Sequence, residues 1–150
     1  MRVFVLSLVV FSAAGLGACA GRGRPAPVAA IPTGASTGTL AQVYYWRAKP
    51  GKFEEYSRYI RELAEPIDHE AGRHGAFVSV TTFVARDTTS AWTHMRVFVL
   101  RDSAQLRALS GALDSAGMRL EPDSAKRRAR GEYSASLRDR VGAVTAEILR

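Results

Sequence analysis

The sequence predicts one α+β domain in the C-terminal part of the chain, beginning near Leu40. Aromatic and branched residues are sparse between residues 20 and 39 but recur at regular spacing from Leu40 onward. In that part, segments with an apolar period of two alternate with a segment in which apolar residues recur every three or four positions. These are the periods of strands and of amphipathic helices. The segment of about 110 residues has the size of one typical domain.

The first predicted strand covers Val43 to Ala48, a β-branched and aromatic segment. It ends at Lys49-Pro50-Gly51, which is a strong turn signal. An amphipathic helix is predicted from Phe53, because its apolar residues are spaced by three and four: Phe53, Tyr56, Ile60, Leu63, Ala64 and Ile67. Pro66 is expected to kink this helix or to end its regular part.

Residues 76–85 and 91–100 are predicted to form two further strands. The polar link between them is short, so the two strands are expected to pair as an antiparallel hairpin. A second helix should follow, with Asp102 or Ser103 as its N-cap and Gly117 at its end.

The last thirty residues give weaker signals. Residues 121–140 are polar and basic and predict no clear element. Residues 141–149 predict either a last strand or a short helix, and their Val, Thr and Ile content favours the strand slightly.

The order strand, helix, strand, strand, helix, with or without a last strand, is that of a ferredoxin-like fold with its helices on one face of the sheet. Residues 45–53, which read YWRAKPGKF and precede a charged amphipathic helix, resemble the opening of the dimeric α/β-barrel proteins. That group includes antibiotic-biosynthesis-type monooxygenases and NIPSNAP-like domains, and the resemblance covers residues 42–149. It implies a homodimer whose subunits pair their sheets face to face, and it does not imply one activity.

Residues 1–18 have the layout of a secretory signal peptide. Arg2 precedes an uncharged run from Val3 to Leu16, which is shorter than the roughly 20 residues that a helix needs to cross a bilayer. The end of the run, Leu16-Gly17-Ala18-Cys19, resembles the lipobox of bacterial lipoproteins. The resemblance implies cleavage before Cys19, whose thiol is the nucleophile that accepts the lipid and its palmitate-like acyl chains. The chain is therefore predicted to be a lipoprotein precursor.

Residues 19–39 are predicted to hold the lipidated cysteine and a flexible linker rich in Gly, Pro, Ala and Thr, with a reach of about 25 Å. The resemblance to lipoproteins implies the outer membrane facing the periplasm, because Ala20 replaces the aspartate associated with inner-membrane retention. Cleavage removes one charged residue, Arg2, so the net charge falls from +7 to +6. This balance favours anionic lipid surfaces, and nucleic acid is not an expected partner in that compartment.

No metal site is predicted. The segment from His69 to His74, HEAGRH, resembles the zinc motif HExxH but has one residue too many. Positions five apart lie about 140° from each other around a helix, so the two imidazoles could not converge on one metal. A solvated helix end is the preferred interpretation.

The strand over residues 91–100 predicts a ligand pocket. Alternation places Trp92, His94, Arg96 and Phe98 on one face, and Thr93, Met95, Val97 and Val99 on the other. We expect the second set to lie under the helices, so that the first set faces the dimer cavity. The candidate pocket residues are Trp92, His94, Arg96, Phe98, Phe77, Ser79 and Thr81, with Phe83 beside them. The first strand should add either Tyr45 and Arg47 or Tyr44 and Trp46. The preferred interpretation is that these residues only pack and hydrogen-bond at a subunit interface, and the ligand pocket is the functional alternative.

Two functions are consistent with these patterns. The preferred one is an envelope lipoprotein that binds a small apolar or amphipathic ligand, or a protein, without catalysis. The alternative is a monooxygenase-like or haem-handling oxidoreductase, with His94 as base or axial ligand and Arg96 bound to an anionic group such as a propionate. The sequence identifies no catalytic residue and no cofactor, because it contains no Gly-rich phosphate loop, no GxSxG motif and no triad spacing.

Overall fold

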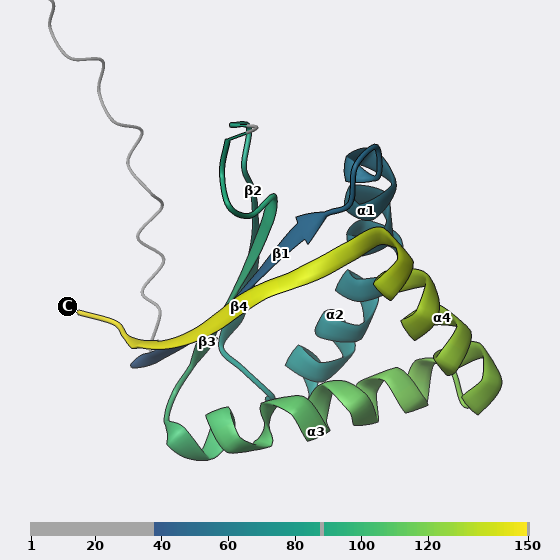
Figure 1. The fold of residues 1–150 in the computed structure, drawn as a ribbon. Coiled ribbons are helices and arrows are strands. Elements are labelled where there is room, and N and C mark those ends of the chain that lie inside the picture. The colour runs from purple at the N-terminus through teal and green to yellow at the C-terminus, as the bar shows by residue number, and fades with distance from the viewer. Residues whose placement is uncertain (1–37, 88, 150) are drawn as a thin grey trace, which may run out of the picture. The chain divides into compact units, whose positions relative to one another are not determined.

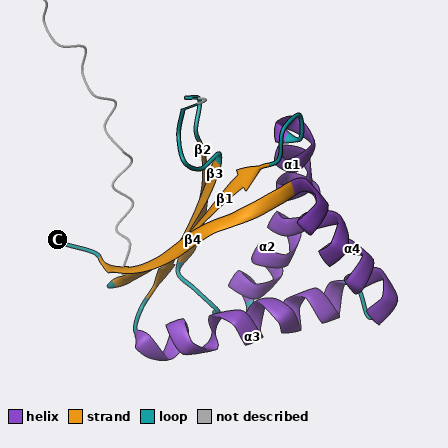
Figure 2. Ribbon diagram, in the orientation of Figure 1, coloured by secondary structure: helices purple, strands orange, loops and turns teal. Residues whose placement is uncertain are grey.

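The computed structural model describes residues 38–87 and 89–149, which form an α+β domain with its helices on one side of a four-stranded sheet (Figure 1, Figure 2). The strands are β1 (Leu40–Ala48), β2 (Ser79–Val84), β3 (His94–Leu100) and β4 (Arg138–Glu147), and all pairings are antiparallel. Their order across the sheet is β2-β3-β1-β4. This order, with a helical crossover after β1 and another after β3, confirms the predicted ferredoxin-like class. The predicted signal peptide and Cys19, and the predicted linker up to residue 37, lie outside the described residues.

The first crossover is interrupted where the sequence predicted a break. It consists of α1 (Phe53–Tyr59), the π-helical turn η1 (Ile60–Ala64) and α2 (Glu65–Arg73). Pro66 lies in the first turn of α2. Its nitrogen carries no hydrogen and cannot donate to the carbonyl of Glu62, so the regular helix is interrupted just before it. The turn ahead of α1 also forms as predicted, with Gly51 at a φ of 72°.

The second crossover contains two helices, α3 (Ser103–Leu120) and α4 (Ser124–Leu137). The Asp102 carboxylate caps α3 by accepting hydrogen bonds from the backbone N–H groups of Ala104 and Gln105. The prediction that Gly117 ends α3 is wrong, because the helix continues to Leu120. Gly117 instead allows close packing, since a Cβ at this position would lie 3.2 Å from Nη2 of Arg130 on α4.

The C-terminal part forms a helix and then a strand. Asp123 caps α4 at the backbone N–H groups of Ala125 and Lys126, in a region where the sequence predicted no clear element. Residues 141–147 belong to a strand, which is one of the two predicted alternatives. The strand starts earlier, at Arg138, and its pairing with β1 shifts register between Tyr45 and Trp46.

The buried face of the sheet is opposite to the predicted one. His94, Arg96 and Phe98 are 1%, 8% and 2% exposed and face the helices, whereas Met95, Val97 and Val99 are only partly buried. The expectation that the apolar set lies under the helices is therefore wrong. The physical reason is that His94 and Arg96 find buried polar partners on the helices, while Phe98 and Leu100 on the same face supply the apolar core.

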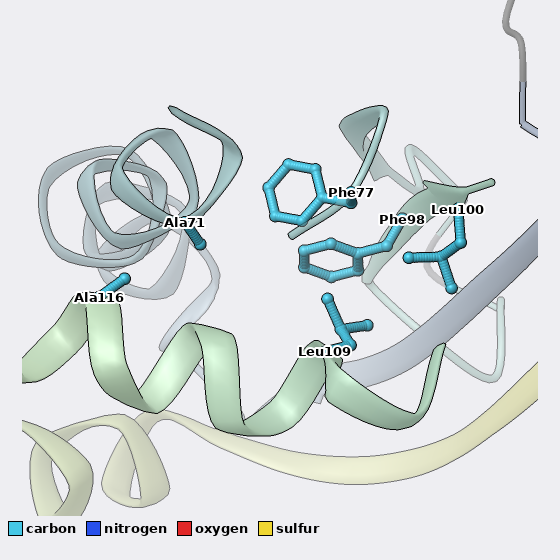
Figure 3. Close-up of a cluster of buried hydrophobic side chains, with 6 residues drawn as sticks. All are labelled: Ala71, Phe77, Phe98, Leu100, Leu109 and Ala116. Atoms are coloured by element: carbon cyan, nitrogen blue, oxygen red, sulfur yellow. The ribbon is translucent and has the colours of Figure 1, made fainter. Parts of the chain in front are cut away.

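Two apolar clusters hold the helices on the sheet. Figure 3 shows the larger one, in which α2, α3 and the sheet meet; it comprises Ala71, Phe77, Phe98, Leu100, Leu109 and Ala116. The rings of Phe77 and Phe98 pack edge to face, with their centroids 5.2 Å apart. The second cluster joins Tyr56 and Ile60 to Leu137 at the end of α4. Within residues 38–87 and 89–149, no helix has both the length and the hydropathy needed to cross a bilayer.

Candidate functional site

The seven predicted pocket residues do not line one pocket. Four of them lie on the helix side of the sheet or in the core beneath it: Phe77, His94, Arg96 and Phe98. Ser79 and Thr81 lie on the other face, because they pair with Val99 and Val97. Trp92 precedes β3, and its ring centroid lies 6.1 Å from that of Tyr45, which also belongs to the other face.

His94 takes part in a chain of hydrogen bonds between the sheet and α1. Its Nε2 lies 2.9 Å from the Ser57 hydroxyl, and its Nδ1 lies 2.9 Å from the Thr93 hydroxyl. Ser57 donates to the carbonyl of Phe53 and Thr93 accepts from the N–H of Ala48. The Thr93 hydroxyl has one proton and two acceptors within reach, the Trp46 carbonyl at 3.4 Å and His94 Nδ1 at 2.9 Å. Donation over the shorter distance assigns the imidazole proton to Nε2, which donates to Ser57. Every partner is satisfied when the imidazole is neutral.

The surroundings of His94 favour that neutral form. The ring lies against Tyr56 and Phe53, with centroid distances of 4.5 Å and 5.2 Å, and its burial lowers its pKa to about 4. Both ring nitrogens already have hydroxyl partners, so His94 offers no free nitrogen to a metal or a substrate. Ser57 and Thr93 border a cavity of about 640 Å³ between α1 and the β2–β3 hairpin, but His94 itself is not among the residues that line it.

The buried His94 is expected to make the domain less stable as the pH falls. In the unfolded chain the imidazole takes up a proton below its ordinary pKa of 6.5, whereas in the folded domain it does so only near 4. The domain should therefore keep its full free energy of unfolding above pH 6.5. Between pH 6.5 and 4 this free energy should fall by up to about 3 kcal/mol. Urea unfolding across this range would show a shallower pH dependence in His94→Gln than in the parent. Equal slopes would contradict the buried neutral imidazole, and His69→Gln controls for loss of an exposed ring.

A buried ion pair lies next to this chain. The Arg96 Nη2 on β3 contacts the Asp68 Oδ2 on α2, and the two residues are 8% and 3% exposed. Burial lowers the pKa of Arg96, and its guanidinium lies 5.3 Å from the centroid of the Phe98 ring. The Arg96 Nε is buried and has no hydrogen-bond partner among the residues that the structure describes.

Arg96 borders a cavity of about 280 Å³ between the helix side of the sheet and α3, which we call the arginine–aromatic pocket. Its lining residues are Tyr44, Trp46, Arg96, Phe98, Ser110, Leu113, Arg138 and Arg140. A cavity of about 170 Å³ adjoins it and shares Trp46, Arg96, Leu113 and Arg138 with it. Alternation in β4 places Arg138 and Arg140 opposite Ala48 and Trp46, on the face that looks toward the helices.

Three guanidinium groups lie against aromatic rings of this region. Arg138 Cζ is 4.6 Å from the centroid of the Trp46 ring, and Arg140 Cζ is 5.5 Å from that of Tyr44. The lining residues of the two adjoining cavities include one carboxylate, Asp68, which already pairs with Arg96. Two positive charges of the pocket therefore have no acidic partner among these residues.

Sequence reasoning found part of this pocket. It named Arg96 and Phe98 and left Tyr44 and Trp46 as one of two alternatives for β1. It did not place Arg138 and Arg140 in the pocket, because it predicted no strand before residue 141 and assigned both arginines to a solvated basic segment. The alternation of Arg138 and Arg140 with Asp139, directly before the apolar tail, is the signal that could have extended the strand.

The segment that resembles HExxH forms an ion cluster instead. The Glu70 side chain accepts hydrogen bonds from Arg73 and from Arg119 on α3, and these bonds lower its pKa to about 2. His74 Nε2 lies 3.1 Å from Glu70 Oε1, while His69 is exposed. Within the described part of the chain, no three His, Cys, Asp or Glu residues are grouped as a metal site requires. The cluster links α2 to α3.

No protein-family model matches the chain, and no curated protein matches its sequence. Solved structures that resemble it include HapK from Hahella chejuensis, with a TM-score of 0.49 and 11% identity over 73% of this chain and 92% of that one. Another is PA3566 from Pseudomonas aeruginosa, with a TM-score of 0.44 and 19% identity over 78% of this chain and 98% of that one. The fold assignment itself follows from the strand order described above.

Proposed function

We propose that this protein is a lipid-anchored module of the bacterial cell envelope that binds a small amphipathic ligand in the arginine–aromatic pocket. The observation that carries the proposal is the composition of that pocket. The rings of Tyr44, Trp46 and Phe98 supply apolar walls, and three arginines supply a few charged groups. Ligand sites usually combine these two properties.

Binding fits the geometry better than catalysis does. The pocket lining contains no histidine, carboxylate or cysteine that could act as base or nucleophile. His94, the residue expected to serve an oxidoreductase, has both ring nitrogens engaged by hydroxyl groups and does not border the pocket. A haem-handling or monooxygenase function therefore receives no support from this arrangement.

The proposed lipid anchor is inferred from the N-terminal sequence. Cleavage before Cys19 and acylation of its thiol would hold the domain at the outer membrane, on a linker with a reach of about 25 Å. An amphipathic ligand is consistent with this location, because such molecules partition to membrane surfaces.

A second copy of the chain is the proposed partner of the other sheet face. We call this the open face; its strands carry Tyr45, Phe83, Met95, Val97 and Val144. Phe83 is 46% exposed and Val144 is 50% exposed. Apolar side chains on neighbouring strands form the kind of patch that a two-fold interface covers.

The binding function can be tested with N-phenyl-1-naphthylamine, a neutral dye whose fluorescence rises in apolar surroundings. The parent domain should bind it, and Ser110→Trp should reduce its affinity at least about tenfold, because an indole on α3 fills the cavity. Ser124→Trp is the matched control, since Ser124 is an exposed residue on α4 that lines neither cavity. Equal binding by all three proteins would place the dye elsewhere and contradict the proposal.

A further inference from the structure

We infer that the ligand of the arginine–aromatic pocket is a small organic acid, whose carboxylate or sulfonate group binds Arg138 and Arg140 and whose planar apolar part lies against the aromatic wall. The inference rests on the proposed binding function and adds the chemical class of the ligand. Three independent features of the described residues support it: the free N–H groups of the arginines, an unmet buried donor, and the size of the cavity.

The first feature is the state of the two arginines on β4. Arg138 donates one hydrogen bond, from Nε to the Ser134 hydroxyl at 3.0 Å, and Arg140 has no hydrogen bond or ion pair with any described side chain. Each guanidinium lies near an aromatic ring, and no described residue accepts a hydrogen bond from Arg140 or from the terminal nitrogens of Arg138. Guanidinium N–H groups of this kind are suited to the paired oxygens of a carboxylate or sulfonate.

The second feature is the unmet donor on Arg96. Its Nε is fully buried, lacks a hydrogen-bond partner among the described residues, and belongs to a side chain of the pocket wall. Buried donors without a partner are rare in folded proteins because desolvation is not compensated. A bound acid adds a negative charge beside this guanidinium, which belongs to the pocket wall. Asp68 cannot neutralise the rest of the pocket, because it is already in contact with Nη2 of the same guanidinium.

The third feature is the size and lining of the cavity. The pocket of about 280 Å³ and the adjoining cavity of about 170 Å³ share Trp46 and Leu113 as apolar walls. Each volume lies below the range for drug-sized ligands, about 300–1,000 Å³, whereas the two adjoining cavities together fall within it, so they fit a molecule of two or three rings. Inorganic phosphate alone would leave the aromatic wall without a contact.

Two dyes with the same ring skeleton distinguish the contribution of a negative charge to binding from the contribution of apolar contacts. 8-Anilinonaphthalene-1-sulfonate is N-phenyl-1-naphthylamine with one added sulfonate. At one fixed ionic strength, the full domain should bind the sulfonate dye at least about tenfold more tightly than the neutral one. Arg140→Gln should remove most of that preference and leave the affinity for the neutral dye unchanged. Arg128→Gln is the matched control, because Arg128 is an exposed arginine on α4 that lines neither cavity.

The outcomes of this experiment distinguish the inference about the ligand class from the proposed binding function. Tighter binding of the sulfonate dye that depends on Arg140 and is blocked by Ser110→Trp supports both the organic-acid ligand and the proposed binding function. Equal affinities for the two dyes, or a preference that Arg140→Gln leaves intact, would overturn the organic acid and leave the binding function standing. Failure of both dyes to bind would overturn both. Displacement of the sulfonate dye by an equal concentration of inorganic phosphate would show that the anion alone is recognised, which also overturns the inference.

Discussion

Replacing Asp68 with alanine is expected to lower the free energy of unfolding by about 3–5 kcal/mol, because it leaves the Arg96 guanidinium buried without its counter-ion. Arg96 is 8% exposed and its Nε already lacks a hydrogen-bond partner among the described residues, so the guanidinium stays buried after it loses its ion-pair partner. A domain of this size is stable by about 5–15 kcal/mol in total, and the loss should therefore be visible in urea unfolding followed by circular dichroism.

Two further variants make this measurement specific to the ion pair. Glu62→Ala removes an exposed carboxylate from the same helical segment and should change the stability by less than about 0.5 kcal/mol. The double variant Asp68→Leu with Arg96→Met replaces both charges with apolar side chains, and should recover most of the stability that Asp68→Ala loses. If Asp68→Ala were as mild as Glu62→Ala, Arg96 would not be buried against α2.

The order of elements could be predicted from the sequence because its signals are local. The turn at Lys49-Pro50-Gly51, the break before Pro66 and the cap at Asp102 each depend on residues a few positions apart. The apolar period of each segment then assigned its type. Once the elements were in order, the connection rules of small sheets left few arrangements, and the ferredoxin-like one was among them.

The buried face of β3 could not be read in the same way. On hydropathy alone, Met95, Val97 and Val99 form a better core than a set with a histidine and an arginine. Which face of β3 is buried depends on Ser57, which hydrogen-bonds to His94 from 37 residues away, and on Asp68, which pairs with Arg96. Burial of a polar side chain is favourable only when such a partner is present, and strand alternation contains no information about partners on another element.

A signal for these partners does exist in the first helical segment. Ser57 and Asp68 fall on its apolar stripe, at the spacing shared by Phe53, Ile60 and Ala64. A serine and an aspartate among residues that face the sheet require polar groups on the sheet opposite them. Considering the helix and the strand together would therefore have favoured His94 and Arg96 as the helix-facing set.

Phe98→Ala should lower the free energy of unfolding by about 3–5 kcal/mol, because Phe98 is 2% exposed and lies at the centre of the larger apolar cluster. It packs edge to face against both Phe77 and Tyr44, so its removal opens a cavity between the sheet and α3. Val97→Asp, one residue away on the open face, should cost about 1 kcal/mol, since the carboxylate remains accessible to water in the separate subunit. Urea unfolding at submicromolar concentration compares the two without contributions from assembly.

The same pair of variants tests the proposed partner of the open face. Light scattering at micromolar concentration should give the mass of a dimer for the parent and of a monomer for Val97→Asp, because an unpaired carboxylate would be buried between two sheets. A parent that is monomeric would contradict the proposed dimer and leave the buried face as described. If instead Val97→Asp destabilised the domain as much as Phe98→Ala, the apolar set would face the helices, and the arginine–aromatic pocket could not lie where Arg96 and Phe98 now border it.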